Sequence, residues 1–243
     1  MNGSMNSNNR SDFFLFFFLF LLLQAGRAED SLGYTEPYRI ITISAAETGV
    51  IAEVFVEEGA AVKKGQIVAK LDTATLEAEL EIAKAEATLQ STRKRRLDEL
   101  ATSSRATPEE LEKARTDLTI KQAQVRKFEA MIETRLMRSP VDGVVTEIKR
   151  DPSEAVSAAN PQVLTVVQID KLTANLFLSP AKALQLKAGG QAGLLVDDHE
   201  RLFAKVEFIS PVTDAASGTV RVKFTIDNAG GTHRSGAKCA LVE

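Results

Sequence analysis

The chain has 243 residues, enough for one or two domains, and its 44% apolar content is ordinary for a globular protein. Its net charge of −3 provides no general basic field, so nucleic-acid binding is not predicted. With no Trp, two His and a single Cys at position 239, the sequence excludes an intramolecular disulfide framework and offers few residues for catalysis or metal binding.

The N-terminal segment has the order of a secretory signal peptide. Polar residues 1–12, with Arg10 as their one cation, precede the apolar run "FFLFFFLFLLL", and small residues follow as far as Ala28. We therefore expect residues 1–28 to be removed on export. The alternative is a retained membrane anchor, which needs roughly 20 apolar residues, about twice the length of this run.

Residues 38–73 are predicted to form a compact β segment. From Tyr38, "YRIITISAAETGVIAEVFV" alternates apolar and polar residues, as half-buried strands do. Further along, Gly59 and Gly65 separate short apolar runs. Glycines there permit the positive-φ turns that short antiparallel strands require.

Two long helices are predicted within residues 74–134. The first, from Thr75 to about Ser103, contains no Gly or Pro and has two adjacent apolar stripes, which suggests packing on more than one neighbour. The stripes are Leu76, Leu80, Ala83 and Ala87, and beside them Ala78, Ile82, Ala85 and Leu89. The second helix has a heptad seam, interrupted by Lys121, of Leu111, Ala114, Leu118, Val125, Phe128 and Ile132. With a short loop between them, the helices are predicted to pack as an antiparallel coiled-coil hairpin.

After the helices the β pattern resumes and repeats itself. The run "GVIAEV" at 49–54 corresponds to "GVVTEI" at 143–148. Residues 38–73 and 135–170 are therefore predicted to form one small β domain of two similar halves, with the helices inserted between them.

The split pattern "TGVIAEVFVEEGAAVKKGQIVAKLD" and "RLMRSPVDGVVTEI" resembles the biotinyl/lipoyl-type domain of periplasmic adaptor subunits, the membrane fusion proteins of bacterial efflux pumps. Within residues 171–243, "LTANLFLSPAKALQLKAGGQAGLLV" and "AKVEFISPVTDAASGTVRVKFTIDN" resemble the β-barrel domain of the same family, particularly adaptors of resistance–nodulation–division (RND) exporters. The resemblance implies an elongated α+β protein. Its antiparallel coiled-coil α-hairpin is inserted in a lipoyl/biotinyl-like β domain, and a small β-barrel domain follows.

Two features depart from the family pattern. Ser153 and Ala159 stand where the paired glycines of the first half would fall in the second. The sequence also ends just after the last expected barrel strand, so the membrane-proximal domain of typical RND adaptors is expected to be largely absent.

The resemblance implies a non-catalytic adaptor in the periplasm, associated with the inner membrane. It would link an inner-membrane transporter, with the RND type favoured, to an outer-membrane channel in a tripartite pump that exports small compounds. The family also suggests a ring of six copies. An adaptor for an ATP-driven (ABC-type) exporter or secretion system is an alternative reading, and a periplasmic coiled-coil scaffold is another.

A carrier subunit of an enzyme is a rival from another class, because lipoyl and biotinyl domains hold their cofactor on a lysine at the hairpin between halves. Here the inserted helices replace that hairpin, and "LDTATLEAEL" has no lysine at the turn, so no cofactor is expected. His199 and His233 lie in polar, turn-like segments without a second His at metal-binding spacing. Neither a catalytic nor a metal site is therefore predicted.

The stretch "RRLDELATSSRATPEELEKA", at 95–114, forms the break between the helices. Thr107, Pro108 and Glu110 have the pattern of a helix start with a capping box, and "ATSSRA" is the loop before it. The simplest interpretation is that the chain only reverses here.

The spacing of Arg96, Leu100 and Thr107 also resembles the tip motif with which RND adaptors contact the outer-membrane duct, with Thr in place of the family's Ser. By that resemblance we expect these three residues to bind the outer-membrane channel. The basic run "RKRR" at 93–96 is interpreted as a solvated helical face that its acidic neighbours neutralise. Those neighbours are Asp98, Glu99, Glu109, Glu110 and Glu112.

Two polar loops of the last domain, "VDDHERL" at 196–202 and "DNAGGTHRSG" at 227–236, are expected to contact the transporter. The residues expected to bind it are Asp197, Asp198, His199, His233 and Arg234. The alternative is that both loops are simple hairpin turns.

Overall fold

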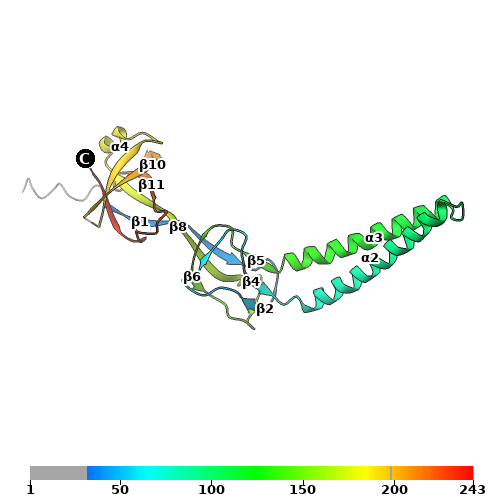
Figure 1. Ribbon diagram of the computed structural model, residues 1–243. Coiled ribbons are helices and arrows are strands. Elements are labelled where there is room, and N and C mark those ends of the chain that lie inside the picture. The colour runs from blue at the N-terminus through cyan, green and yellow to red at the C-terminus, as the bar shows by residue number, and fades with distance from the viewer. Residues whose placement is uncertain (1–31, 198, 243) are drawn as a thin grey trace, which may run out of the picture. The chain divides into compact units, whose positions relative to one another are not determined.

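The computed structural model describes residues 32–197 and 199–242 (Figure 1). The predicted signal peptide, residues 1–28, lies outside the described residues, and so does Asp198. The chain divides into two compact units, which we call the hairpin unit, residues 39–168, and the barrel unit, residues 32–38 with 169–242. Among the helices that the structure describes, none combines the length and the apolar character needed to cross a membrane.

The hairpin unit contains short antiparallel strands around one apolar core. One sheet has the strand order β5, β4, β2, β7, with bounds Leu136–Arg138, Ile67–Leu71, Gly49–Val54 and Ala155–Val156. The other pairs β3 (Ala61–Val62), β6 (Gly143–Ile148) and the first part of β8 (Gln162–Leu178). Fully buried side chains fill the core, including Ile51, Val68, Val145 and Leu164.

The two halves of the repeat pair with each other reciprocally. In one pairing β2 contacts β7, and in the other β6 contacts β3. Gly49 lies opposite Val156, just as Gly143 lies opposite Val62. Because each half completes the other's sheet, neither half has all of its strand partners without the other.

Ser153 occupies the turn position that Gly59 holds in the first half. Its backbone has φ 73°, close to the φ of 85° at Gly59. The two amides also make equivalent hydrogen bonds, from Gly59 to the carbonyl of Val145 and from Ser153 to that of Ile51, both 2.8 Å long. The left-handed turn is therefore kept without glycine, at a cost of roughly 1–2 kcal/mol for a residue with a Cβ.

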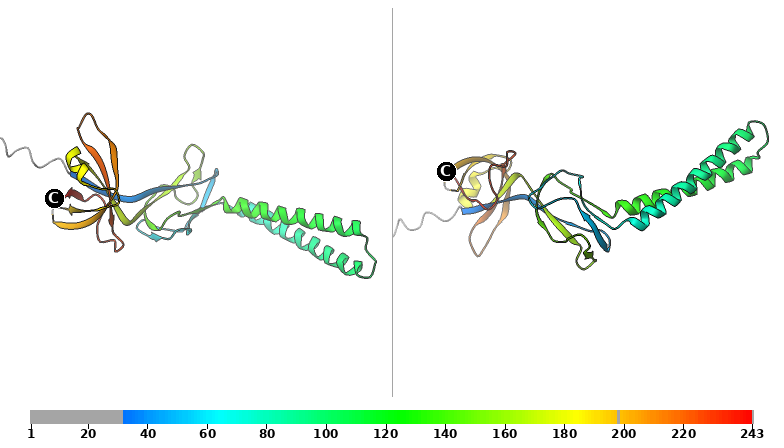
Figure 2. Two further views of the ribbon diagram at one scale, coloured as in Figure 1. Left: turned by 90° about the horizontal axis from the view of Figure 1, so that it is seen from above. Right: turned by 60° about the horizontal axis from the view of Figure 1, so that its bottom comes forward.

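Helices α2 (Ala74–Ala101) and α3 (Pro108–Glu133) are inserted between β4 and β5. They lie side by side and run in opposite directions, with the loop 102–107 at one end (Figures 1 and 2). Leu76 and Ala83 of α2 and Ala114 of α3 are the buried residues of these helices. The contact between the helices is therefore a narrow seam, to which half-buried apolar side chains such as Leu118 and Phe128 also contribute.

Lys121, which interrupts the apolar seam of α3, makes an ion pair across the hairpin. Its Nζ lies 2.7 Å from a carboxylate oxygen of Glu86 on α2. A second ion pair joins Lys84 of α2 to Glu129 of α3 at 3.2 Å. The polar interruption is thus paired with the opposite helix, and does not break the packing.

The two apolar stripes of α2 have different surroundings. The stripe that starts at Leu76 faces α3, whereas Ile82 and Leu89 of the other stripe are 62% and 66% exposed. Ala78 and Ala85 of that stripe are exposed as well. Within the described chain only one stripe therefore has a packing partner, and the expectation of a second neighbour is not met inside this molecule.

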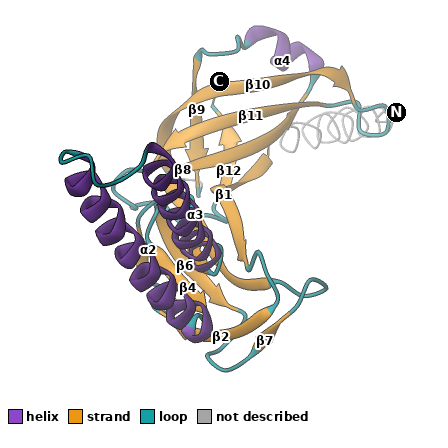
Figure 3. Ribbon diagram, turned by 90° about the vertical axis from the view of Figure 1, so that its right-hand side faces the viewer, coloured by secondary structure: helices purple, strands orange, loops and turns teal. Residues whose placement is uncertain are grey.

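The barrel unit is a closed antiparallel sheet. Its strand order is β1, β12, β9, β10, β11, β8, and β8 also pairs with β1, which closes the ring (Figure 3). The bounds are β1 Leu32–Ser44, β9 Gln191–Val196, β10 Glu200–Thr213, β11 Val220–Asp227 and β12 Lys238–Leu241. A short helix, α4 (Pro180–Gln185), follows β8. The core of the barrel includes the fully buried Leu172, Leu176, Leu194, Phe224 and Ile226.

The barrel includes a strand from the start of the described chain, which the sequence analysis did not assign to it. Leu32 pairs with Ala240 and Tyr34 with Lys238, so the first part of β1 lies beside the last strand, β12. The predicted domain of residues 171–243 therefore lacked one of its six strands. Pairing between residues some 200 positions apart leaves no local signal in the sequence.

Candidate functional site at the hairpin tip

The tip is closed by backbone hydrogen bonds to the last turn of α2. The amides of Ser103 and Arg105 both donate to the carbonyl oxygen of Leu100, at 3.1 and 3.0 Å. Ser104, between them, has φ 54°, the left-handed conformation that ends many helices. The tip loop is therefore ordered by its own backbone and holds the end of α2 close to the start of α3.

The capping box predicted at the start of α3 is confirmed. The Glu110 amide donates to the Thr107 hydroxyl at 3.2 Å, and the Thr107 amide donates to the Glu110 carboxylate at 2.8 Å. The pKa of Glu110 is lowered, first by the Thr107 amide and then by the Thr107 hydroxyl, because both hydrogen bonds favour the ionised carboxylate. The Glu110 side chain is thus committed to Thr107.

The three residues expected to bind the outer-membrane channel are all exposed. Leu100 is 42% exposed, a large fraction for an apolar side chain, and Arg96 and Thr107 are exposed as well. Arg96 has no ion pair within the described residues, whereas Thr107 uses its hydroxyl in the cap. The tip therefore presents an apolar side chain and a free guanidinium near each other on α2.

The two loops expected to contact the transporter lie together at one end of the barrel. Glu200, within the first loop, is 3.5 Å from His233 of the second. The Asp197 carboxylate accepts a hydrogen bond from the Lys238 amide at 3.1 Å, and the Asp197 amide donates to the Lys238 carbonyl at 2.8 Å. His199 is exposed in the same turn, and Asp198 lies outside the described residues.

Local hydrogen bonds account for much of the second loop. The His233 amide donates to the Asn228 side chain at 3.0 Å, and the Thr35 hydroxyl donates to the carbonyl of Arg234 at 3.1 Å. These bonds hold the loop against the barrel whether or not a partner is present. In the part of the chain that the structure describes, no group of three or more His, Cys, Asp or Glu side chains is placed to hold a metal ion.

In the described part of the chain, the basic run at 93–96 is neutralised by its predicted acidic neighbours only at two of its four cations. Lys94 pairs with Asp98 at 2.6 Å and Arg95 with Glu99 at 2.9 Å. Arg93 and Arg96 have no ion pair among the residues that the structure describes. The sequence carried this signal, because the residues four positions after Arg93 and Arg96 are leucines, whereas Lys94 and Arg95 are each followed there by an acid.

Comparison with known proteins identifies the family to which this architecture corresponds. A family described as RND MFP, barrel-sandwich hybrid domain, matches residues 39–168, just over half of the chain. A curated relative, the macrolide export protein MacA of Yersinia pestis, is 25% identical over 81% of this chain and 62% of its own length. The antibiotic efflux pump periplasmic linker protein ArpA of Pseudomonas putida is 24% identical over 81% of this chain and 57% of its own.

Among solved structures, a MacA–MexA chimeric protein that contains the Pseudomonas aeruginosa MexA α-hairpin domain has a similar fold. It superposes with a TM-score of 0.72 at 20% identity, covering 87% of this chain and 80% of that one. The chain spans between half and two thirds of the length of the first curated relatives that it matches. From the extent of the family match, the protein belongs to the RND membrane fusion proteins, with residues 39–168 as its barrel-sandwich hybrid domain.

Proposed function

We propose that this protein is a periplasmic adaptor that links an inner-membrane transporter to an outer-membrane channel in a tripartite efflux pump for small compounds. In this proposal residues 1–28 direct export, and residues 38–73 with 135–170 form a lipoyl-like domain. Residues 74–134 form a coiled-coil hairpin that reaches the channel, and the barrel lies at the transporter end. The observation that carries the proposal is the exposed tip of a hairpin inserted in a domain of this family.

The chemistry of the tip supports channel binding. An apolar side chain such as Leu100 gains most when a partner removes it from water, and an Arg beside it can bind carbonyl or carboxylate oxygens of that partner. Thr107 contributes indirectly, because its capping box fixes where α3 starts. Arg96 and Leu100 would contact the channel directly, and Thr107 would fix the turn next to them.

The exposed stripe on α2 supports assembly into a ring. Ile82 and Leu89 are large apolar side chains without a partner in the described chain, and Ala78 and Ala85 beside them allow a neighbouring helix to approach closely. A second copy that packed its hairpin here would cover the stripe. A ring of six such copies would enclose a conduit, which a single adaptor cannot do.

Two classes of transporter are candidates for the partner. The RND type is favoured by the family that matches residues 39–168. An ATP-driven exporter is the second candidate, because the macrolide export relative, which suggests ABC-type export, matches as well as the antibiotic efflux pump linker protein does, at 25% and 24% identity. In either case the two loops around Asp197 and His233 are the proposed transporter contacts.

Replacing Leu100 with Asp tests the proposed function. An uncompensated charge in a contact that must be dehydrated is unfavourable by several kcal/mol, so Leu100→Asp should abolish co-purification with the outer-membrane channel. The fold should persist, because Leu100 is outside the seam.

Leu118→Asp is the matched variant, because Leu118 is half-buried between the helices. It should lower the helical circular dichroism signal and the melting temperature of the hairpin. If Leu100→Asp melts as Leu118→Asp does, or if it still co-purifies with the channel, the tip assignment is wrong.

A further inference from the structure

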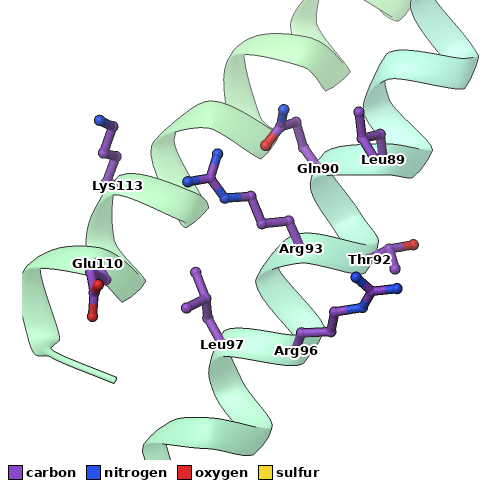
Figure 4. A pocket seen from close by; sticks show the side chains of 8 residues that line it. All are labelled: Leu89, Gln90, Thr92, Arg93, Arg96, Leu97, Glu110 and Lys113. Atoms are coloured by element: carbon purple, nitrogen blue, oxygen red, sulfur yellow. The ribbon is translucent and has the colours of Figure 1, made fainter. Parts of the chain in front are cut away.

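A groove runs between α2 and α3 next to the tip (Figure 4). Leucine side chains and cations line it, among them Leu89, Arg93, Arg96 and Leu97 from α2 and Lys113 from α3. Figure 4 shows Arg93 and Leu97 projecting into the space between the helices, while Arg96 extends along the other side of α2. The groove therefore combines apolar side chains with positive charges.

The three cations of this groove are among those that the described hairpin leaves without an ion pair. Within the described residues, Arg93, Arg96 and Lys113 make none. The neighbouring Lys94 and Arg95 are both paired with acids on their own helix. Positive charge is thus neutralised along the rest of α2 and left available where the groove lies.

Glu110 is the one acid among the described residues that line the groove, and it makes no ion pair with these cations. Its carboxylate accepts hydrogen bonds from both the amide and the hydroxyl of Thr107, at 2.8 and 3.0 Å. The Gln90 side-chain carbonyl, also in the lining, is buried without a hydrogen-bond partner in the described chain. The groove accordingly has unpaired cations available to an external ligand, whereas the Gln90 oxygen is buried.

We infer that this groove binds an acidic segment of the outer-membrane channel protein, one that carries a carboxylate beside an apolar side chain. The inference rests on the proposed function and extends its contact from Leu100 along α2 to Arg93, about 10 Å at a rise of ~1.5 Å per residue. Arg93 and Lys113 would hold the carboxylate through charge-assisted hydrogen bonds. Leu97 would cover the apolar neighbour, and Arg96 would belong to both the groove and the tip.

The test is a charge reversal in the groove against a charge reversal beside it. Arg93→Glu with Lys113→Glu changes one cation on each helix inside the groove. Arg95→Glu with Arg115→Glu makes the same change of net charge on the same two helices, at exposed positions that do not line the groove. Helical circular dichroism of both double variants verifies that the hairpin is intact.

The probe is the purified outer-membrane channel of the same organism, measured by biolayer interferometry at two salt concentrations. The groove variant should bind at least about tenfold more weakly, because like charges would oppose the carboxylate. The matched variant should stay within about threefold of the unaltered protein, and the affinity of the unaltered protein should fall with salt. Equal affinities for the two double variants would overturn the inference.

Leu100→Asp in the same assay separates the inference from the proposed function. If Leu100→Asp loses binding and the groove variant does not, the tip contact is supported and the groove inference is wrong. If the groove variant loses binding and Leu100→Asp does not, the groove inference is supported and the assignment of Leu100 to the contact is wrong.

Photocrosslinking from benzoylphenylalanine in place of Thr92, which also lines the groove, identifies the occupant in cells. Adducts to an Asp- or Glu-containing peptide of the channel support the inference. Adducts to a second copy of this chain with none to the channel would contradict it.

Discussion

The hairpin and the barrel are stabilised in different ways. The barrel closes its sheet around side chains that are fully buried, such as Leu172, Leu194 and Phe224. In helices α2 and α3 only Leu76, Ala83 and Ala114 are fully buried, and half-buried seam residues such as Leu118, ion pairs and a capping box complete the packing. A substitution in the barrel should therefore change stability. On most of the hairpin surface it should change binding, because those side chains are not required for packing.

The largest expected effect is in the barrel core. Phe224→Ala should lower the free energy of unfolding by about 3–5 kcal/mol, because it leaves a cavity in a closed sheet. Ile82→Ala, on the exposed stripe of the hairpin, should change it by less than about 0.5 kcal/mol. Chemical denaturation of both variants, followed by circular dichroism, measures the difference. Similar losses for the two variants would show that the hairpin surface is packed after all.

A smaller effect is expected at the tip, where one cap stabilises α3. Thr107→Ala should lower hairpin stability by about 1 kcal/mol, within a range of roughly 0.5–2 kcal/mol, because the Glu110 amide loses its acceptor. Hydrogen exchange in the first turn of α3 should speed up, while exchange in the barrel stays unchanged. Thr116→Ala, at an exposed position inside the same helix, is the control and should not accelerate exchange. Unchanged exchange in Thr107→Ala would mean that the cap does not limit opening of the tip.

The repeat in the hairpin unit offers a smaller, stabilising change. Ser153→Gly should raise the free energy of unfolding by about 0.5–1 kcal/mol, because glycine adopts φ 73° without the Cβ penalty but has more freedom when unfolded. Gly59→Ala, at the equivalent turn, should have the opposite sign. Thermal melts of both variants test the pair. A loss of stability in Ser153→Gly would show that the serine side chain matters more than the backbone strain.

The smallest effect concerns the pH dependence of the same cap. The pKa of Glu110 in the folded protein lies below its usual value of 4.5, so its contribution to stability is present above that value. It should be lost as pH falls through the lowered pKa. Hydrogen exchange at the start of α3, compared between pH 6 and pH 3, should show this loss in the unaltered protein and a weaker one in Thr107→Ala. An identical pH profile in both would exclude the capping box as its source.

Local patterns in the sequence were sufficient for the elements with local causes. The first helix was predicted from Thr75 and begins at Ala74, and the second was predicted to begin at Pro108 after the cap residue Thr107, as it does. The capping box was readable because all of its hydrogen bonds join residues three positions apart. Mixed α and β organisation followed from the change between periods of two and of about 3.6 residues.

Contacts between distant residues decided the rest. The first part of β1 joins the barrel beside β12, and no periodicity in the sequence predicts the pairing between Leu32 and Ala240. The two apolar stripes of α2 look alike in sequence, yet α3 covers one and leaves Ile82 and Leu89 exposed. Only the position of α3 decides which stripe is free.

The groove shows most clearly which features follow from the sequence and which follow from the tertiary structure. The sequence by itself determined that Arg93 and Arg96 have no acid four residues later, because that spacing is set by the helix alone. Only the tertiary structure brought Lys113 of the second helix to the same groove and committed the Glu110 carboxylate to Thr107. The physical reason is that a charge is neutralised or left free by what lies within a few ångströms of it, and across a hairpin that distance depends on how the two helices pack.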